Sequence, residues 1–141
     1  MTDLTVGLSA EVNTVVTEQD TAARWGSGLV ESLSTPAMIA LMEGAAFNAT
    51  RGALPPGQTT VGVHVNVSHL AATPVGRRVR ARAELVNLQG RKLYFQVEAW
   101  DELEKIGEGT HERVVVDLGR FAKRLDVKRP LEDHLKHDSN P

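Results

Sequence analysis

Three residues in the first half of this 141-residue sequence could together carry acyl-transfer chemistry: Thr35, Glu43 and His69. Glu43 is the only ionisable residue between Pro36 and Arg51, in a segment whose apolar composition predicts a buried helix. An unpaired carboxylate in such a helix is costly or becomes protonated, so it indicates either acid–base function or a structural hydrogen bond. A position at the one wet edge of the helix would also explain it.

Thr35 and His69 also have ordinary structural explanations. Thr35 precedes Pro36, a pattern typical of a helix start, where a threonine caps the first free amides. His69 follows the parity of a valine-rich strand, and a histidine there is more often structural than functional. A hydroxyl at a helix N-terminus, a carboxylate and an imidazole are nevertheless the groups that acyl transfer needs, so the three together indicate catalysis better than any one alone.

Arginines form a second set of candidates. Arg113 lies in GTHERVVV, a predicted strand of mostly apolar and small residues. Its guanidinium fork could grip a phosphate or a carboxylate, or it could pair across strands with Glu84 or Glu98. The arginines at 77, 78, 80 and 82 could meet phosphate groups, although a solvated strand face is the simpler explanation.

Hydrophobic periodicity predicts the elements that position these residues. Residues 4–17 alternate loosely and predict a strand, and the helix then runs from Thr35 to Arg51. After the turn at residues 55–57 the period becomes two, which predicts a strand with two distinct faces. One face carries Val61, Val63, Val65, Val67 and His69, and the other carries Gly62, His64, Asn66 and Ser68.

Three further alternating runs, at 77–88, 91–100 and 105–118, predict a meander of antiparallel strands. A helix that is apolar nearly all round needs cover on several sides, and one curved sheet supplies it. The fold class expected is therefore α+β, a hotdog fold with one long buried helix wrapped by a curved antiparallel sheet of about five strands. We expect one domain over residues 1–141, with a highly charged C-terminal tail from about residue 122 that frays toward its end.

Composition narrows the possible functions. Hydrophobic residues make up 41% of the chain, charged residues 24%, and the formal net charge is −2, so neither nucleic acid nor an acidic membrane is an expected partner. No apolar run is long enough to span a bilayer and the first residues lack a secretory pattern, so the cytoplasm is expected. There is no cysteine, and His64, His111, His134 and His137 have no metal-ligand spacing, so no metal site is expected.

Three blocks of the chain are similar to a known family. STPAMIALMEGAAF, VGVHVNVSHLAATPVG and IGEGTHERVVVDLGRF, between about Leu33 and Phe121, resemble the fluoroacetyl-CoA thioesterase family of hotdog hydrolases. The resemblance implies hydrolysis of a small acyl-CoA thioester to a free acid and coenzyme A by a homodimer, without a metal or redox cofactor.

The resemblance also implies roles for individual residues. The family's catalytic threonine, glutamate and histidine fall on Thr35, Glu43 and His69. Its substrate-contacting glycine and arginine fall on Gly62 and Arg113.

One departure from the family concerns substrate choice. Its best-known member shields the fluorinated acyl group with a phenylalanine just before the catalytic threonine, whereas residues 25–30 here read WGSGLV, without phenylalanine. We therefore expect the reaction class but not the fluoroacetyl specificity. Two alternatives remain open: a hotdog module that binds acyl-CoA without turnover, and a hotdog enoyl-CoA hydratase or dehydratase, whose aspartate–histidine motif we do not find.

The spacing of the three candidate catalytic residues favours a site shared between subunits. In an unbroken helix, Thr35 and Glu43 are separated by about 12 Å and point about 80° apart. Contact with His69 as well would require the chain at Thr35 to fold back, and a two-fold dimer relieves this constraint. We expect a substrate cleft at a dimer interface, with at least one contacting residue from each chain.

Overall fold

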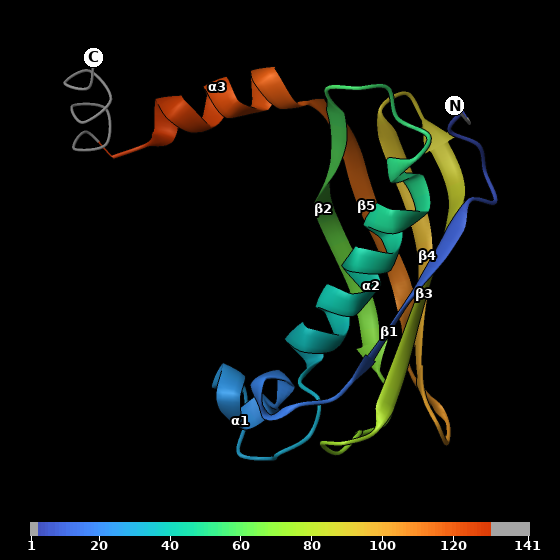
Figure 1. Cartoon of the computed structure of the whole chain (residues 1–141), viewed down its shortest axis with the longest axis vertical. Helices are drawn as coiled ribbons and strands as arrows, with labels where there is room; N and C mark the ends of the chain where they lie inside the picture. Colours follow the sequence, from blue (N-terminus) through green and yellow to red (C-terminus); the bar gives the residue numbers. More distant parts are fainter. Residues whose placement is uncertain (1–2, 131–141) are drawn as a thin grey trace.

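The computed structural model describes residues 3–130, which form one antiparallel sheet with a helix across one face (Figure 1). The elements are β1 (Ser9–Val15), a 3-10 turn η1 (Glu18–Asp20), α1 (Ala22–Trp25), α2 (Thr35–Arg51), β2 (Gln58–His69), β3 (Arg78–Gln89), β4 (Lys92–Asp101), β5 (Lys105–Asp117) and α3 (Leu118–Lys128). The strand order is β1-β3-β4-β5-β2, so β2, the strand that follows α2, lies at one edge beside β5. The first strand is shorter than the predicted range of 4–17.

The start of α2 differs from the sequence prediction in one respect. Ser34 is the N-cap residue, and its hydroxyl accepts a hydrogen bond of 3.1 Å from the amide of Ala37. Pro36 occupies the first turn, where its missing N–H costs nothing. Thr35 is therefore the first helical residue and not the cap, which leaves its hydroxyl available for another partner.

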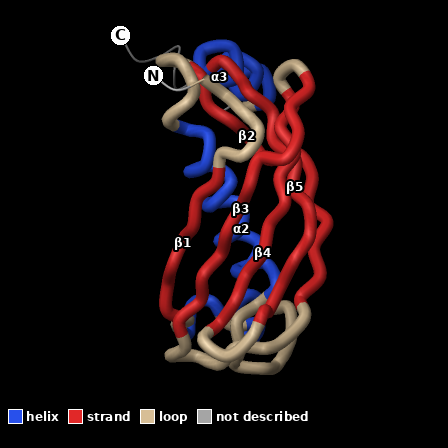
Figure 2. Tube along the Cα trace, turned by 90° about the vertical axis from the view of Figure 1, so that its right-hand side faces the viewer, coloured by secondary structure: helices blue, strands red, loops and turns tan. Residues whose placement is uncertain are grey.

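The buried side of α2 fixes the helix on the sheet. Alanines and two methionines, Met38 and Met42, face the strands and join Phe95 and Leu85 in the hydrophobic core. Figure 2 shows the strands in front and α2 behind them, on the concave side of the curved sheet. This arrangement confirms the predicted α+β hotdog fold with five strands.

The opposite side of α2 is open in the single chain. Glu43 and Phe47 are half-buried, while Ala40 and Asn48 are exposed. The prediction of a helix buried on all sides is therefore wrong for one subunit, because one sheet covers only one face of it. The apolar residues on the open face were the reason for the prediction.

A β-bulge in β2 changes which residues share a face. Gly62 pairs with Arg113, and the next pair is His64 with Glu112, so Val63 is an extra residue without a partner. The side chain of Val63 accordingly lies outside, with 53% of its surface exposed.

The bulge reverses the side-chain parity along the strand. Before it, Thr60 is buried and Gly62 faces α2. After it, Val67 packs against the core and His69 faces the first turn of α2. The prediction that Gly62 and His69 lie on opposite faces is wrong, because strict alternation does not survive an inserted residue.

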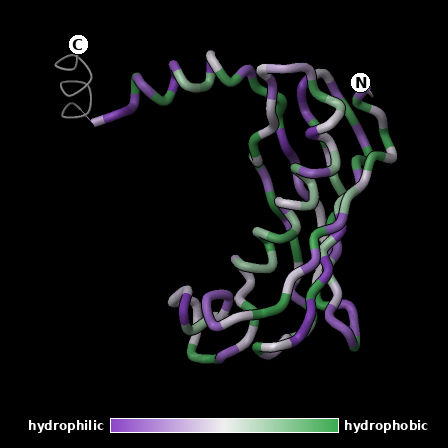
Figure 3. Tube along the Cα trace, viewed as in Figure 1, coloured by the Kyte–Doolittle hydropathy of each residue, from purple (hydrophilic) through white to green (hydrophobic). Residues whose placement is uncertain are grey.

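The chain after β5 is helical where a charged tail was predicted. α3 leaves the end of β5 and extends away from the sheet (Figure 1), and hydrophilic and hydrophobic residues mix along it (Figure 3). Residues 131–141, including His134 and His137, lie outside the described part of the chain. Among the described helices, none is long and apolar enough to cross a membrane.

Candidate functional site

The first group of candidate residues is a hydrogen-bonded pair at one end of the sheet. Thr35 Oγ1 in the first turn of α2 lies 2.8 Å from His69 Nδ1 at the last residue of β2. Burial lowers the pKa of His69 below its ordinary value, and the nearby backbone of Ala71 opposes this shift. The imidazole is therefore neutral near pH 7 and able to accept the hydroxyl proton. Its Nε2 is buried and forms no hydrogen bond within residues 3–130.

An uncharged cavity of about 480 Å³ adjoins this pair. Thr35 and His69 lie in its wall, with apolar side chains such as Val30, Leu33 and Ala71 from the segments before α2 and after β2. No acidic or basic side chain lines it apart from the imidazole. A cavity of this composition suits an apolar group next to the hydroxyl and the imidazole.

The second group of candidate residues lies further along β2 and α2. Glu43 Oε2 is 3.8 Å from Arg113 Nη1, and both face Gly62. A methyl group at Gly62 would lie 3.1 Å from Glu43 Oε2 and 3.4 Å from Arg113 Nη1, so only glycine lets the backbone approach these two groups without displacing them. The Glu43 side chain is 42% exposed, so the prediction of a buried carboxylate is wrong for the single chain.

Arg113 is held rigidly from β2. Its Nε donates to Thr60 Oγ1 and its Nη2 donates to the backbone carbonyl of Thr60, each at 2.9 Å. Only 8% of its side chain is exposed, and burial lowers its pKa while Glu43 opposes that shift. The guanidinium remains charged, because its pKa starts very high. Its orientation is thus fixed before any ligand binds.

The alternative role for Arg113, a cross-strand partner of an acidic residue, does not hold. Its register neighbours are Gly62 on β2 and Leu93 on β4. The two acidic residues considered, Glu84 and Glu98, pair with other basic side chains, at 3.0 Å and 2.8 Å.

His111 belongs to the second group and was missed from the sequence. Its Nδ1 donates to the carbonyl of His64 at 2.8 Å, which leaves Nε2 free to accept from Arg113 Nη1 at 3.2 Å. Burial, and then the charge of Arg113, lower its pKa, whereas the His64 carbonyl, Glu43 and Glu112 oppose the shift. Two-residue spacing from Arg113 on one strand was a signal that could have identified it.

The two groups are separate within one chain. Gly62 and His69 are seven positions apart on β2, a separation of about 20 Å for an extended strand. Within residues 3–130, no hydrogen bond or ion pair joins Glu43 to Thr35 or to His69. The sequence-predicted residues therefore form two clusters, Thr35 with His69 and Glu43 with Gly62 and Arg113.

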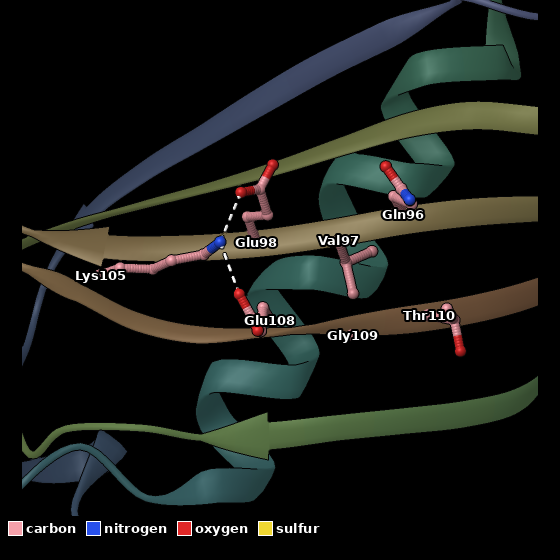
Figure 4. A pocket seen from close by; sticks show the side chains of 7 residues that line it. All are labelled: Gln96, Val97, Glu98, Lys105, Glu108, Gly109 and Thr110. Atoms are coloured by element: carbon pink, nitrogen blue, oxygen red, sulfur yellow. Dashed lines mark ion pairs between the residues drawn. The ribbon is translucent and has the colours of Figure 1, made fainter.

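A further hollow of about 330 Å³ lies on the other face of the sheet, away from α2 (Figure 4). There Lys105 Nζ lies 2.8 Å from Glu98 and 2.6 Å from Glu108, as the dashed lines show. Two carboxylates share this one ammonium group, and none of the candidate residues lines the hollow. We therefore do not place the functional site there.

The chain is similar to known proteins over most of its length. The model of the fluoroacetyl-CoA-specific thioesterase family matches residues 16–118. A fluoroacetyl-CoA thioesterase of Streptantibioticus cattleyicolor is 41% identical over 100 residues, which are 71% of this chain and 72% of that protein.

Solved structures extend the similarity to the fold. The fluoroacetyl-CoA thioesterase FlK superposes with a TM-score of 0.85 at 34% identity, over 90% of this chain and 98% of that one. A substituted form of FlK in complex with acetyl-CoA gives the same TM-score and identity, over 90% of this chain and 100% of that one.

Proposed function

The chain belongs to the fluoroacetyl-CoA-specific thioesterase family, and from this premise we propose that it hydrolyses a small acyl-CoA thioester in a cleft between two subunits. Thr35 and His69 of one subunit act together with Glu43, Gly62 and Arg113 of the other. The observation that carries the proposal is the separation of these two groups along one unpaired edge strand.

Pairing through β2 explains how the two groups meet. β2 is a 12-residue edge strand, and a free edge of this length tends to pair with another strand. If β2 pairs antiparallel with the same strand of a second subunit, a two-fold axis brings the His69 end of one chain to the Gly62 end of the other. The same contact covers the open, partly apolar face of α2. Both features support a dimer with two equivalent clefts.

The chemistry assigned to the cleft is water attack on the thioester carbonyl. The bond from carbon to water oxygen forms, the carbon–sulfur bond breaks, and the water proton finally reaches the sulfur. Glu43 removes the proton from water, or attacks the carbonyl itself to give an acyl anhydride that water then opens. His69 protonates the leaving sulfur. Thr35 either relays a proton to the imidazole of His69 or positions the water.

The groups around Glu43 stabilise this attack. The amide of Gly62 donates to the carbonyl oxygen, which can come close because no side chain stands in the way. Arg113 orients the Glu43 carboxylate and adds positive charge near the developing oxyanion. Thr60 and His111 hold Arg113 in place, so little reorganisation is needed during the reaction.

The substrate class follows from the cavity beside Thr35 and His69. Its uncharged wall favours a neutral apolar acyl group over a dicarboxylic one. Because residues 25–30 contain no phenylalanine, we propose turnover of small neutral acyl groups without a requirement for fluorine.

A thiol-release assay tests the proposed function. Acetyl-, fluoroacetyl-, isobutyryl-, benzoyl- and succinyl-CoA are supplied in turn, and we expect release from the neutral substrates and little from succinyl-CoA. Saturable binding with no thiol from any substrate would favour a binding module. Loss of enoyl absorbance from crotonyl-CoA would favour a hydratase.

A further inference from the structure

An arginine-lined cavity lies at the end of the sheet from which α3 emerges. It has a volume of about 270 Å³ and is bounded by the end of β5, the turn between β3 and β4, and one side of α3. Its charged lining residues are Arg91, Arg120, Arg124 and Asp117. None of them belongs to the two groups assigned to the reaction.

The charge in this cavity is not balanced by its neighbours. Asp117 Oδ2 is the one carboxylate in its lining, 3.6 Å from Arg91 Nη2 and 3.9 Å from Arg120 Nε. Arg124 forms no ion pair within the described residues 3–130. Three guanidinium groups therefore share one acidic group, which makes the cavity attractive to an anion.

Two arginines of β3, Arg80 and Arg82, provide the contrast. Arg80 lies 2.8 Å from Glu11 and stacks on Trp100, and Arg82 lies 3.0 Å from Glu84. Each has a carboxylate of its own. Phosphate binding by these two arginines would require breaking their ion pairs, whereas the cavity under α3 has more positive than negative side chains in its lining.

We propose that this cavity binds phosphate groups of the coenzyme A part of the substrate, an inference that rests on the proposed function. Phosphate oxygens match the guanidinium fork, which donates two parallel hydrogen bonds to one anion. Arg91 is already oriented, because its Nη1 donates to the carbonyl of Val115 at 3.2 Å. Arg120 and Arg124 are one helical turn apart on α3 and face the same side.

The cavity lies where the nucleotide end of the substrate can reach it. Val116, in its wall, is three residues beyond Arg113 on β5, about 10 Å along the strand. The two-fold pairing of β2 would bring this end of one subunit to the Thr35–His69 cavity of the other. The acyl group and the phosphates of one substrate then occupy sites at opposite ends of a single cleft.

Paired substrates separate binding of the phosphates from catalysis. The steady-state kinetics of one acyl-CoA are compared with those of the same acyl group on pantetheine, which lacks the nucleotide and its phosphates. For Arg120→Ala/Arg124→Ala we expect KM for the acyl-CoA to rise about tenfold or more, and KM for the acyl-pantetheine to stay within about twofold of wild type. Both positions lie on an exposed helix that tolerates alanine.

Lys123→Ala removes one positive charge from α3 at a position that does not line the cavity, and serves as the control. An equal rise in KM for Lys123→Ala, or equal rises for both substrates in the double variant, would overturn the proposal. If wild type turns over neither substrate, the proposed function fails instead. Calorimetric titration with free coenzyme A then decides: tenfold weaker binding by the double variant than by Lys123→Ala supports the cavity, and equal binding contradicts it.

Discussion

The Thr35–His69 pair and the Glu43–Arg113 group differ in how the fold holds them. Thr35 and His69 stand at the ends of their elements, beside an open cavity, and depend on a single contact of 2.8 Å. Arg113 lies within β5, is 8% exposed, and is bonded to Thr60 and His111. The first group is therefore accessible and adjustable, whereas the second is preorganised. We infer that the first group contacts the acyl group and protonates the leaving sulfur, whereas the second activates the water and stabilises the charge that develops on the carbonyl oxygen.

Removing the charge of Glu43 should have the largest effect. Glu43→Gln keeps the size and hydrogen-bonding capacity of the side chain but can neither accept a proton nor attack the carbonyl. We expect kcat to fall by roughly 10²-fold or more, with the melting temperature close to wild type. Steady-state kinetics of thiol release measure it, and near-normal turnover would remove Glu43 from the mechanism.

A methyl group at Gly62 should disturb the preorganised group. In Gly62→Ala the new carbon would stand 3.1 Å from Glu43 Oε2 and from His111 Cε1, so both must shift. We expect kcat/KM to fall by about tenfold or more, since small displacements of positioned groups cost this much. Gly44→Ala is the matched control, because its methyl group would meet Val12 at an ordinary 3.8 Å. Equal losses in the two variants would show that the space at Gly62 has no special role.

Arg113→Lys tests whether the fork, and not only the charge, matters. A lysine keeps the positive charge but cannot bond Thr60 twice and also reach His111. We expect kcat/KM to fall about tenfold, because Glu43 and the oxyanion lose a positioned charge. The melting temperature should also fall, because Thr60 and His111 lose a buried partner. A lower melting temperature with unchanged kcat/KM would assign Arg113 to stability alone.

Lowering the pH should reduce the free energy of unfolding, because His69 and His111, among the described residues, have lowered pKa values. The pKa values of His69 and His111 lie below the ordinary value of 6.5, so below pH 6.5 the unfolded chain binds protons that the folded one resists. Their contribution to stability is present above pH 6.5 and is lost as the pH falls. The free energy of unfolding, measured with urea at about pH 7.5 and at about pH 5, should differ less between the two pH values in His111→Gln than in wild type. An unchanged difference would contradict this assignment.

How well the sequence predicted the structure differs between these two regions. Thr35, Glu43 and His69 stood out because of their types and settings. The arrangement of α2 with five strands followed from periodicity, whereas α1 and α3 were not predicted. The bulge at Val63 could not be predicted, because an inserted residue leaves no mark on composition. The pairing of Thr35 with His69, and the burial of His111 beside Arg113, depend on contacts between residues distant in sequence.

Subunit complementation tests the central claim, that each site combines Thr35 and His69 of one subunit with Glu43 of the other. Inactive Thr35→Ala and Glu43→Gln proteins are mixed in equal amounts under conditions of subunit exchange. Half of the dimers are then mixed, and each has one intact site, so about a quarter of wild-type activity should return.

The mixture of Thr35→Ala with His69→Ala is the control. Since Thr35 and His69 contact each other within one chain, every site in that mixed dimer carries a lesion and it should stay inactive. Recovery in the first mixture and none in the second is the predicted result. No recovery in the first mixture, with exchange verified by mass spectrometry, would contradict the shared site.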